Sequence, residues 1–171
     1  MVVLGVVSDT HDNYPVTEAL TRVLREEGVD YVVHLGDFVS PFMLKRVFSG
    51  WENRGFAVTG NNDGEIMLHF RIASEMGITL KTHPYAVRLG DKRVLFMHGF
   101  GSIEETLELA RAILRGGSFD VVLYGHTHQM NAERHDGRLL LNPGEASGYL
   151  TGKKTIAILD LSTLDFTFVE L

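Results

Sequence analysis

The chain has 171 residues, of which 44% are hydrophobic, with a net charge of −6 and no cysteine. This length predicts one domain over residues 1–171 with a core of its own, and the composition excludes disulfides and thiolate metal sites. Since no basic run exceeds Lys153-Lys154, a long nucleic acid is not an expected partner. No segment has the length of a secretion signal or a membrane span, so we expect a cytoplasmic protein that does not bind a membrane.

Strands alternate with helices in the first half of the predicted fold. The strands are expected at residues 2–7, 31–35 and 56–59, and the first is a β-branched run typical of a strand buried on both faces. The helices are expected from near Asn13 to Gly28, from Pro41 to about Ser49, and from near Asp63 to Gly77. In the third helix, Ile66, Phe70 and Ala73 share one face. This order predicts a parallel sheet with right-handed crossovers.

The second half is rich in strands. They are expected at residues 85–89, 92–97, 120–124, 130–135, 138–141, 155–159 and 166–170. Gly90-Asp91 and Asp136-Gly137 predict hairpin turns, Asn142-Pro143-Gly144 predicts a further turn, and Ser102 with Glu105 forms a capping box that opens a helix. About ten strands are too many for one compact sheet in so short a chain, so we expect two stacked sheets with outer helices.

Five predicted strands end in side chains that can bind metal ions. These side chains are Asp9 and His11, Asp37, Asn61, His98, and His126 with His128. Ligands of open α/β sheets gather beyond the carboxyl ends of the strands, so the fold would bring all of these residues to one crevice. The helices that begin near Asn13, Asp63 and Ser102 would point their N-termini at the same crevice, where free N–H groups favour an anion.

The residue types in this set predict two metal ions. Two aspartates, one asparagine and four histidines are more ligands than one zinc ion takes. Seven ligands with one shared carboxylate suit two ions that lie roughly 3.5–4 Å apart. Asp37 is the expected bridge, because only a carboxylate offers two oxygens to two different metals.

The order of these motifs resembles that of the calcineurin-like metallophosphoesterases. The match consists of Asp9-x-His11, Gly36-Asp37, Gly60-Asn61-x-Asp63, His98 and Gly125-His126-x-His128, and it spans most of the chain. The short length, Ser-Asp-Thr-His near the start and Asn142-Pro143-Gly144 make the chain similar to the small single-domain phosphodiesterase branch. The resemblance implies an α/β fold, a four-layer αββα sandwich in which two stacked mixed β-sheets are flanked by helices.

The resemblance also implies which residues bind which ion. One ion would lie on Asp9, His11, Asp37 and His128, and the other on Asp37, Asn61, His98 and His126. Mn²⁺ is the expected occupant, and the nitrogen and oxygen ligands also fit the alternatives Ni²⁺, Zn²⁺ and Fe²⁺. A hydroxide that bridges the two ions would attack the phosphorus of a small phosphorylated substrate in line.

One position departs from the pattern of the family. Many members carry a histidine after the Gly-Asn pair, where it binds phosphate and protonates the leaving oxygen, but this chain has Asn62. Asn62 cannot be a general acid near neutral pH, although its amide can donate a hydrogen bond to a phosphoryl oxygen, so we assign it a catalytic and substrate-binding role. General acid catalysis is typically worth about 10²–10⁴-fold. We therefore expect esters with stable leaving oxyanions, such as aryl or nucleotide-type phosphodiesters, to react better than alkyl esters.

The other polar residues near these motifs have mainly structural interpretations. Asn13 is a second candidate for binding phosphate and is equally suited to cap the first helix. His34 is expected in the core or against a ligand, whereas His69, His83 and His135 are expected in solvent. Asp63 is interpreted as the cap of the third helix, and Asp12 as part of a solvated loop. Glu145 stands where relatives often place a small hydroxyl residue, which argues against a phosphate-binding role for its loop.

These observations predict a binuclear metal-dependent phosphodiesterase. A phosphomonoesterase or a nucleotide pyrophosphohydrolase with the same metal centre is the alternative among enzymes. A protein-interaction scaffold of the same fold is the alternative from another class, and the complete set of seven ligands favours the enzyme. The negative charge disfavours a nuclease that processes long nucleic acid. The physiological substrate and the oligomeric state are left open, and a homo-oligomer is compatible with the sequence.

Overall fold

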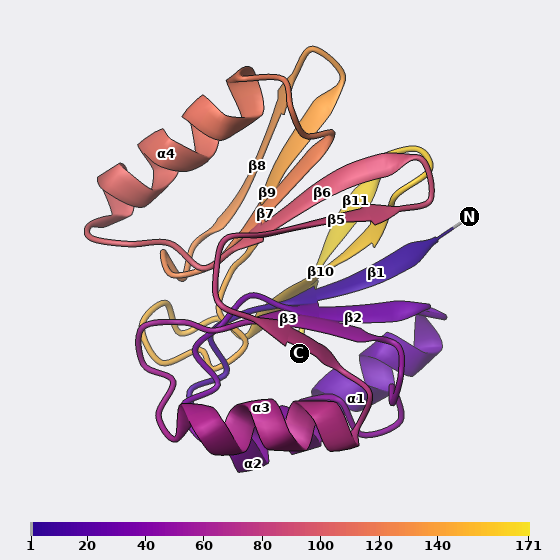
Figure 1. The fold of residues 1–171 in the computed structure, drawn as a ribbon, viewed down its shortest axis with the longest axis vertical. Helices are drawn as coiled ribbons and strands as arrows, with labels where there is room; N and C mark the ends of the chain where they lie inside the picture. Colours follow the sequence, from indigo (N-terminus) through magenta and orange to yellow (C-terminus); the bar gives the residue numbers. More distant parts are fainter. Residues whose placement is uncertain (1) are drawn as a thin grey trace.

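The computed structural model describes residues 2–171, which form four helices and two β-sheets in four layers (Figure 1). The helices are α1 (Val16–Glu26), α2 (Pro41–Val47), α3 (Ile66–Glu75) and α4 (Ile103–Arg115). The first three cover one sheet, the two sheets face each other in the middle, and α4 covers the other sheet. This arrangement confirms the expected αββα sandwich. None of the described helices is both long and apolar enough to cross a membrane.

Both sheets are mixed, as expected. The first has the order β11-β10-β1-β2-β3-β4, with β1 (Val3–Val7), β2 (Tyr31–His34), β3 (Gly55–Val58), β4 (Thr79–Lys81), β10 (Thr155–Asp160) and β11 (Phe166–Glu170). The second has the order β5-β6-β7-β9-β8, with β5 (Tyr85–Leu89), β6 (Lys92–Met97), β7 (Val121–Tyr124), β8 (Met130–His135) and β9 (Arg138–Pro143). β1 to β4 are parallel, and so are β6, β7 and β9. The loops after β1, β2, β3, β6 and β7 meet at one edge, on the left in Figure 1.

β1 contributes to two separate cores. Because successive side chains of a strand point to opposite faces, Val6 packs between the two sheets while Val7 packs toward α1 and α2. Both valines are fully buried, which confirms the prediction from the β-branched run. Burial of each such side chain contributes about 1.5–3 kcal/mol. The strand that carries the first metal-binding motif is therefore held firmly from both sides.

The structure confirms the predicted capping box and hairpins. The Ser102 hydroxyl accepts a hydrogen bond from the N–H of Glu105, whose carboxylate accepts one from the N–H of Ser102. Gly90 and Asp136 have positive φ angles of 61° and 49°, as the tight hairpin turns require.

The sequence missed one strand and ended another too early. β4 was not predicted, because a strand of three residues is too short to show alternation. β9 continues to Pro143, which pairs with Met130, so Asn142 belongs to a strand and not to a turn. The chain turns one residue later, at Gly144, where φ is 83°.

Neither Asn13, one of whose two interpretations was a helix cap, nor Asp63, which was predicted as a cap, caps its helix. α1 has Pro15 at its N-cap and no side-chain cap, and the Asn13 amide instead donates a hydrogen bond to the carbonyl of Ser147 at 2.8 Å. α3 has Glu65 at its N-cap, in the left-handed region and without a side-chain cap, so Asp63 does not cap this helix. Both polar side chains bind backbone groups of other loops.

The buried face of α3 differs from the predicted one. His69, Ile72 and Ala73 are buried, whereas Ile66 and Phe70 are 38% and 37% exposed. His69 was expected in solvent but is fully buried. The packed stripe follows the i, i+3, i+4 spacing that begins at His69, and the predicted stripe shared only Ala73 with it.

Candidate metal centre

The loops after β1 and β7 bring three predicted ligands together. Nε2 of His128 lies 3.4 Å from Oδ1 of Asp9, and Nε2 of His11 lies 3.7 Å from the same oxygen. The rings of His11 and His128 are stacked, with centroids 5.1 Å apart. We call Asp9, His11 and His128 the His128 half of the centre.

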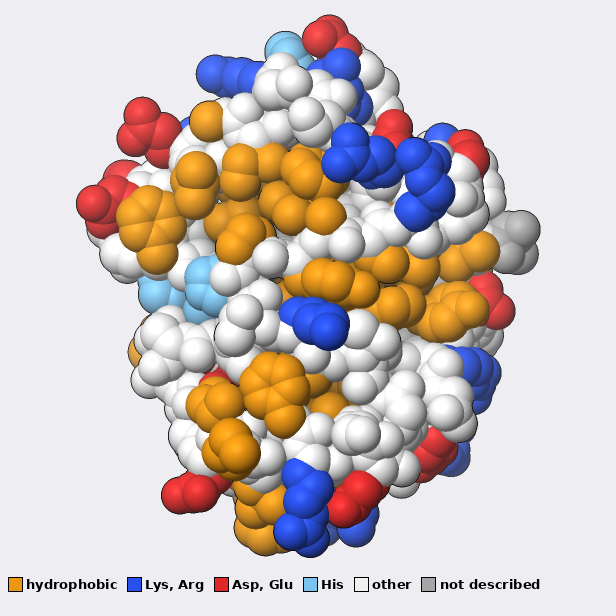
Figure 2. Space-filling model, viewed as in Figure 1, with side chains coloured by type: hydrophobic (Ala, Val, Ile, Leu, Met, Phe, Trp, Pro, Cys, Tyr) orange, Lys and Arg blue, Asp and Glu red, His pale blue; other side chains and the backbone are white. Residues whose placement is uncertain are grey.

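The loops after β3, β6 and β7 bring three more together. Oδ1 of Asn61 lies 2.9 Å from both Nε2 of His98 and Nδ1 of His126. We call Asn61, His98 and His126 the Asn61 half of the centre. In Figure 2, histidine side chains lie together at the left edge of the molecule, at the level where the two sheets meet.

Asp37, after β2, lies between the two halves. Its Oδ2 is 3.5 Å from Nε2 of His11, and its Oδ1 is 3.4 Å from Nε2 of His98. One carboxylate thus presents a separate oxygen to each half. The structure therefore places all seven residues predicted as ligands around one point.

Hydrogen bonds hold three of the imidazoles with one nitrogen facing inward. Nδ1 of His98 bonds the carbonyl of Leu35 at 2.7 Å, and Nε2 of His126 bonds the carbonyl of Gly101 at 3.0 Å. Nδ1 of His128 bonds a carboxylate oxygen of Glu145 at 2.9 Å. Because a carbonyl or a carboxylate can only accept, these nitrogens carry the proton and the other nitrogen of each ring offers its lone pair inward. A protein arranges metal-ligating histidines in this way.

The inward-facing atoms fit cations. The Asn61 oxygen and the lone pairs of His98 and His126 would repel one another at 2.9 Å unless a cation or a proton lay between them. Oδ1 of Asp9 and Nε2 of His11 are buried without any hydrogen-bond partner among the described residues. Ligand atoms that lie about 2.1 Å from one ion are roughly 3.0–3.4 Å apart, close to the separations observed here. The residues present therefore suit two divalent cations.

Five of the seven candidate ligands have a strained backbone. Asp9, His11, Asp37, His126 and His128 have φ angles of 54°, 42°, 61°, 66° and 60°, in the left-handed region that residues other than glycine rarely adopt. Such residues gather at functional sites and persist where surrounding contacts enforce them. Here the N–H groups of Asp9 and His11 donate to the carbonyls of Gly36 and Asp37, which ties the first ligand loop to the second.

Two glycines allow the ligand loops to approach closely. A Cβ atom on Gly60 would lie 2.2 Å from Oδ1 of Asp37, and one on Gly125 would lie 2.1 Å from the Ser8 hydroxyl oxygen. Both distances are far below van der Waals contact. A side chain at either position would push the loops of the centre apart.

Asp63 and Asn62 hold Asp37 in place. The Asp63 carboxylate accepts hydrogen bonds from the N–H groups of Asp37, Val39 and Gly60 at 3.2, 2.9 and 2.7 Å. Asn62 donates to the two Asp37 oxygens, 2.8 Å from its backbone N–H and 2.7 Å from its side-chain amide. Sequence reasoning missed the role of Asp63, because its partners lie on two loops that only the fold brings together.

The charges of the centre depend on one another. Burial raises the pKa of Asp37, but the doubly protonated form of His98, whose Nε2–H then faces Asp37, and the hydrogen bonds from Asn62 outweigh it and hold this pKa far below its usual value. Burial lowers the pKa of His98 and of His11, but the nearby aspartates outweigh it and raise both values above the ordinary one. Asp37 therefore stays ionised near neutral pH and keeps both oxygens as acceptors.

The remaining polar residues have other positions. His34 is fully buried against Phe38, as expected, and burial lowers its pKa well below the ordinary value. His83 was expected in solvent but is half-buried near His98, whereas the side chain of His135 is 42% exposed, in line with the prediction. Asp12 is not simply solvated, since its carboxylate accepts two hydrogen bonds from Ser40, the N-cap of α2.

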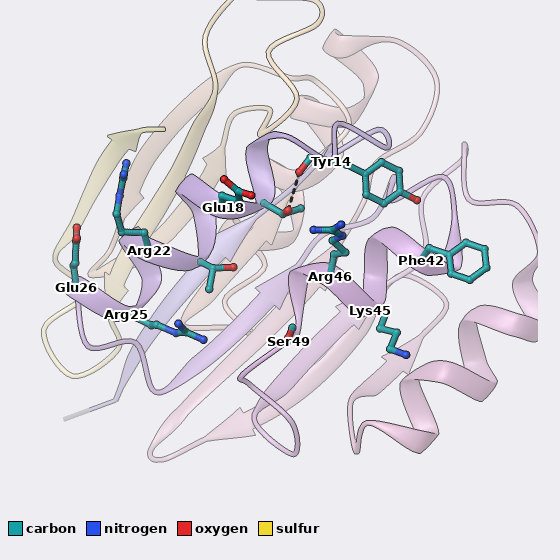
Figure 3. A pocket seen from close by; sticks show the side chains of 11 residues that line it. Tyr14, Glu18, Arg22, Arg25, Glu26, Phe42, Lys45, Arg46 and Ser49 are labelled. Atoms are coloured by element: carbon teal, nitrogen blue, oxygen red, sulfur yellow. Dashed lines mark hydrogen bonds between the residues drawn. The ribbon is translucent and has the colours of Figure 1, made fainter.

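A surface groove of about 970 Å³ lies away from these residues, between α1 and α2 (Figure 3). Arg22, Arg25, Lys45 and Arg46 line it together with two glutamates. None of the seven candidate ligands contributes to it. The groove is therefore separate from the site that the ligand loops form.

Known proteins are similar to this chain in both sequence and fold. A profile of the calcineurin-like phosphoesterase superfamily domain matches residues 2–164. Phosphodiesterase MJ0936 of Methanocaldococcus jannaschii is 36% identical over 171 residues, which cover 98% of each chain.

Solved structures support the same relationship. An archaeal phosphodiesterase superimposes with a TM-score of 0.88 at 33% identity, over 99% of both chains. Zn²⁺-complexed Vps29 from Entamoeba histolytica has a TM-score of 0.72 at 19% identity, over 98% of this chain and 91% of its own, and shares the fold. The chain therefore belongs to the calcineurin-like phosphoesterase superfamily.

Proposed function

We propose that this chain is a phosphodiesterase that depends on two divalent cations. The observation that carries the proposal is the convergence of lone pairs from two carboxylates, one amide and four imidazoles, three of them with the outer nitrogen fixed by a hydrogen bond. The His128 half with Asp37 would hold one cation, and the Asn61 half with Asp37 the other. When bound, the cations lower the pKa of water and neutralise charge on the phosphoryl oxygens.

We propose Mn²⁺ as the occupant. Carboxylate and amide oxygens suit Mn²⁺, and imidazoles suit Fe²⁺, Ni²⁺ and Zn²⁺ as well. The chain has no cysteine, so thiolates do not select a softer metal. Equilibrium dialysis against each metal, followed by an activity assay, would rank the four ions.

The chain's own residues would orient the substrate. The side-chain amide of Asn62 uses one N–H for Asp37, and its second N–H is available for a phosphoryl oxygen. An amide cannot protonate the leaving oxygen, so Asn62 does not act as a general acid for the leaving group. This supports the preference for aryl or nucleotide-type diesters, and the name of the relative MJ0936 also supports a diester.

Apolar side chains lie exposed on the loops next to the ligands. Phe100, two residues after His98, is 49% exposed, and Tyr149 and Leu150, near Glu145, are 62% and 75% exposed. They would contact an aromatic ester group more favourably than a charged one. We therefore propose a small phosphorylated substrate with an apolar or aromatic group.

A substrate panel tests the proposal. The Mn²⁺-loaded protein should hydrolyse bis(p-nitrophenyl) phosphate faster than p-nitrophenyl phosphate, and Asp37→Asn should remove this activity. Asp136→Asn, on an exposed hairpin, is the matched control and should leave activity unchanged. Faster hydrolysis of the monoester would favour the phosphomonoesterase. Metal binding without hydrolysis of any phosphate ester would favour a scaffold, the alternative that shares this fold.

A further inference from the structure

The loop between β9 and β10 is built onto the ligand loop after β1. The N–H groups of Ala146 and Ser147 donate to the carbonyls of Ser8 and Asp9 at 2.9 and 3.1 Å. The Asn13 amide donates to the carbonyl of Ser147 at 2.8 Å. In Figure 1 this loop joins the orange and yellow strands at the left edge, where the ligand loops meet. Residues 145–151 therefore border the His128 half directly.

Glu145 is the centre of this loop, and its carboxylate is fully buried. One oxygen accepts hydrogen bonds from Nδ1 of His128 at 2.9 Å, the Ser147 hydroxyl at 2.8 Å and the N–H of Tyr149 at 3.1 Å. The other accepts from the N–H of Leu150 at 2.9 Å and from the hydroxyl of Thr151 at 2.7 Å, and also from the Thr151 N–H. A buried charge with so many donors is stabilised in place.

The partners of the two Glu145 oxygens are N–H and O–H groups, so this carboxylate acts as an acceptor on all sides. An ionised carboxylate can only accept, so Nδ1 of His128 must carry the proton. The lone pair of His128 is then on Nε2, the atom that lies 3.4 Å from Asp9. The same carboxylate thus sets the tautomer of a candidate ligand and holds three backbone N–H groups of the loop.

We propose that Glu145 is a positioning residue that couples metal binding by His128 to the order of residues 147–151. The proposal rests on the metal-binding part of the proposed function and deepens it. A cation on Nε2 of His128 strengthens the Nδ1–H donor toward Glu145, and the charged carboxylate in turn makes His128 a better ligand. Tyr149 and Leu150, the exposed apolar side chains of this loop, would then be presented to the substrate when the cation is bound.

Glu145→Gln tests the coupling, because glutamine has the same shape but only one accepting oxygen. If its NH₂ group faces His128, the ring must accept at Nδ1 and carry its proton on Nε2, where it cannot bind a cation. If its NH₂ group faces Leu150 and Thr151, it meets backbone donors and the loop loses its anchor. In either orientation, glutamine cannot both accept from Nδ1–H of His128 and anchor the loop N–H groups, as the carboxylate does.

Two measurements that do not depend on enzymatic activity test whether metal binding and loop order are coupled. Calorimetric titration with Mn²⁺ should show that Glu145→Gln weakens binding about 10–100-fold. Hydrogen exchange should show slower exchange of the Tyr149, Leu150 and Thr151 amides when Mn²⁺ is added to the wild type, and no such effect in the variant. Glu133→Gln is the matched control, because Glu133 binds Arg111 on the far side of the second sheet, and it should behave as the wild type in both.

Unchanged Mn²⁺ affinity in Glu145→Gln, or loop amides that do not respond to Mn²⁺ in the wild type, would overturn the proposal. If the variant does not fold, a measurement on the wild-type protein still tests the proposal. In the Zn²⁺-loaded protein, nitrogen-15 NMR should show the His128 proton on Nδ1, and a proton on Nε2 would contradict the proposal. A wild type that shows the coupling but hydrolyses no phosphodiester would refute the proposed function and leave this inference standing.

Discussion

The two halves of the candidate metal centre differ in charge and in burial. The His128 half contains the carboxylate of Asp9, which is fully buried and accepts hydrogen bonds from the Ser8 hydroxyl and the His126 N–H. The Asn61 half contains only neutral ligands, and Asn61 itself is exposed. Since the affinity of a site for a divalent cation rises with the charge of its ligands, we expect the His128 half to bind its cation more tightly.

This difference indicates a division of roles. The His128 half is braced by Glu145 and by the loop after β9, so we expect its cation to be held permanently. In the Asn61 half, His98 is fully buried but Asn61 is exposed, so we expect an exchangeable cation and a phosphoryl oxygen to meet on this side. Asp37 presents one oxygen to each half, so we expect its replacement to affect metal binding the most.

Asp37→Asn should have the largest effect. The change replaces an ionised oxygen by an NH₂ group, which cannot bind a cation, so both halves lose affinity together. We expect phosphodiesterase activity to fall by about 10³-fold or more, measured with bis(p-nitrophenyl) phosphate, and metal analysis to find fewer than two ions per chain. A variant that keeps two ions and full turnover would place the chemistry elsewhere in the molecule.

Asn61→Ala should separate the halves. It removes the one ligand that both His98 and His126 face, but leaves Asp9, His11 and His128 intact. Calorimetry should then show that the tighter binding step persists and the weaker one is lost, with activity reduced about 10²-fold. Loss of the tighter step instead would reverse the order of affinities that we infer from the charges.

Asp63→Asn should have a moderate effect on both halves. The carboxylate binds three backbone N–H groups, and an asparagine with one accepting oxygen leaves at least one of them unpaired. We expect the free energy of unfolding to fall by about 1–3 kcal/mol, measured by urea denaturation without metal. Asp165→Asn is the control, because Asp165 is 81% exposed, and it should leave stability nearly unchanged. Equal stability of both variants would show that Asp63 does not hold the loops.

The sequence predicted the metal ligands better than the residues that hold these ligands in place. Ligand positions such as Asp9 and His98 follow directly from apolar strands that end in polar residues, a signal contained in a few neighbouring positions. The residues that hold the ligands in place are far from them in the sequence. Asp63 binds Asp37 from 26 residues away, and Glu145 binds His128 from 17 residues away. The Gly60-Asn61-x-Asp63 motif contains Asp63 but does not show which groups its carboxylate binds, so the sequence favoured a helix cap for it. No local pattern marks Glu145, and the sequence assigned no role to it.

The errors in the fold have a similar cause. A strand of three residues, β4, forms because β3 offers it an edge, and not because of its own pattern. His69 is buried because it lies on the packed face of α3, where its ring is next to that of Phe38. In each case tertiary contacts decided between local alternatives that the sequence left nearly equal.

The pH dependence of metal binding should be the smallest effect. In the metal-free protein the pKa values of His11 and His98 are raised, so protonated imidazoles beside Asp37 stabilise the fold below pH 6.5, and this contribution is lost as pH rises through the raised values. A cation must displace the same protons, so its affinity should increase with pH over that range, by at most about tenfold per pH unit for each proton released. Calorimetric melting at pH 6, 7 and 8 should therefore show a difference in Tm between Mn²⁺-loaded and metal-free protein that widens with pH. His11→Asn removes one of these protons and should flatten the trend, whereas His135→Asn on an exposed hairpin should not. A difference in Tm that stays constant would mean that neither imidazole is protonated where the cation binds.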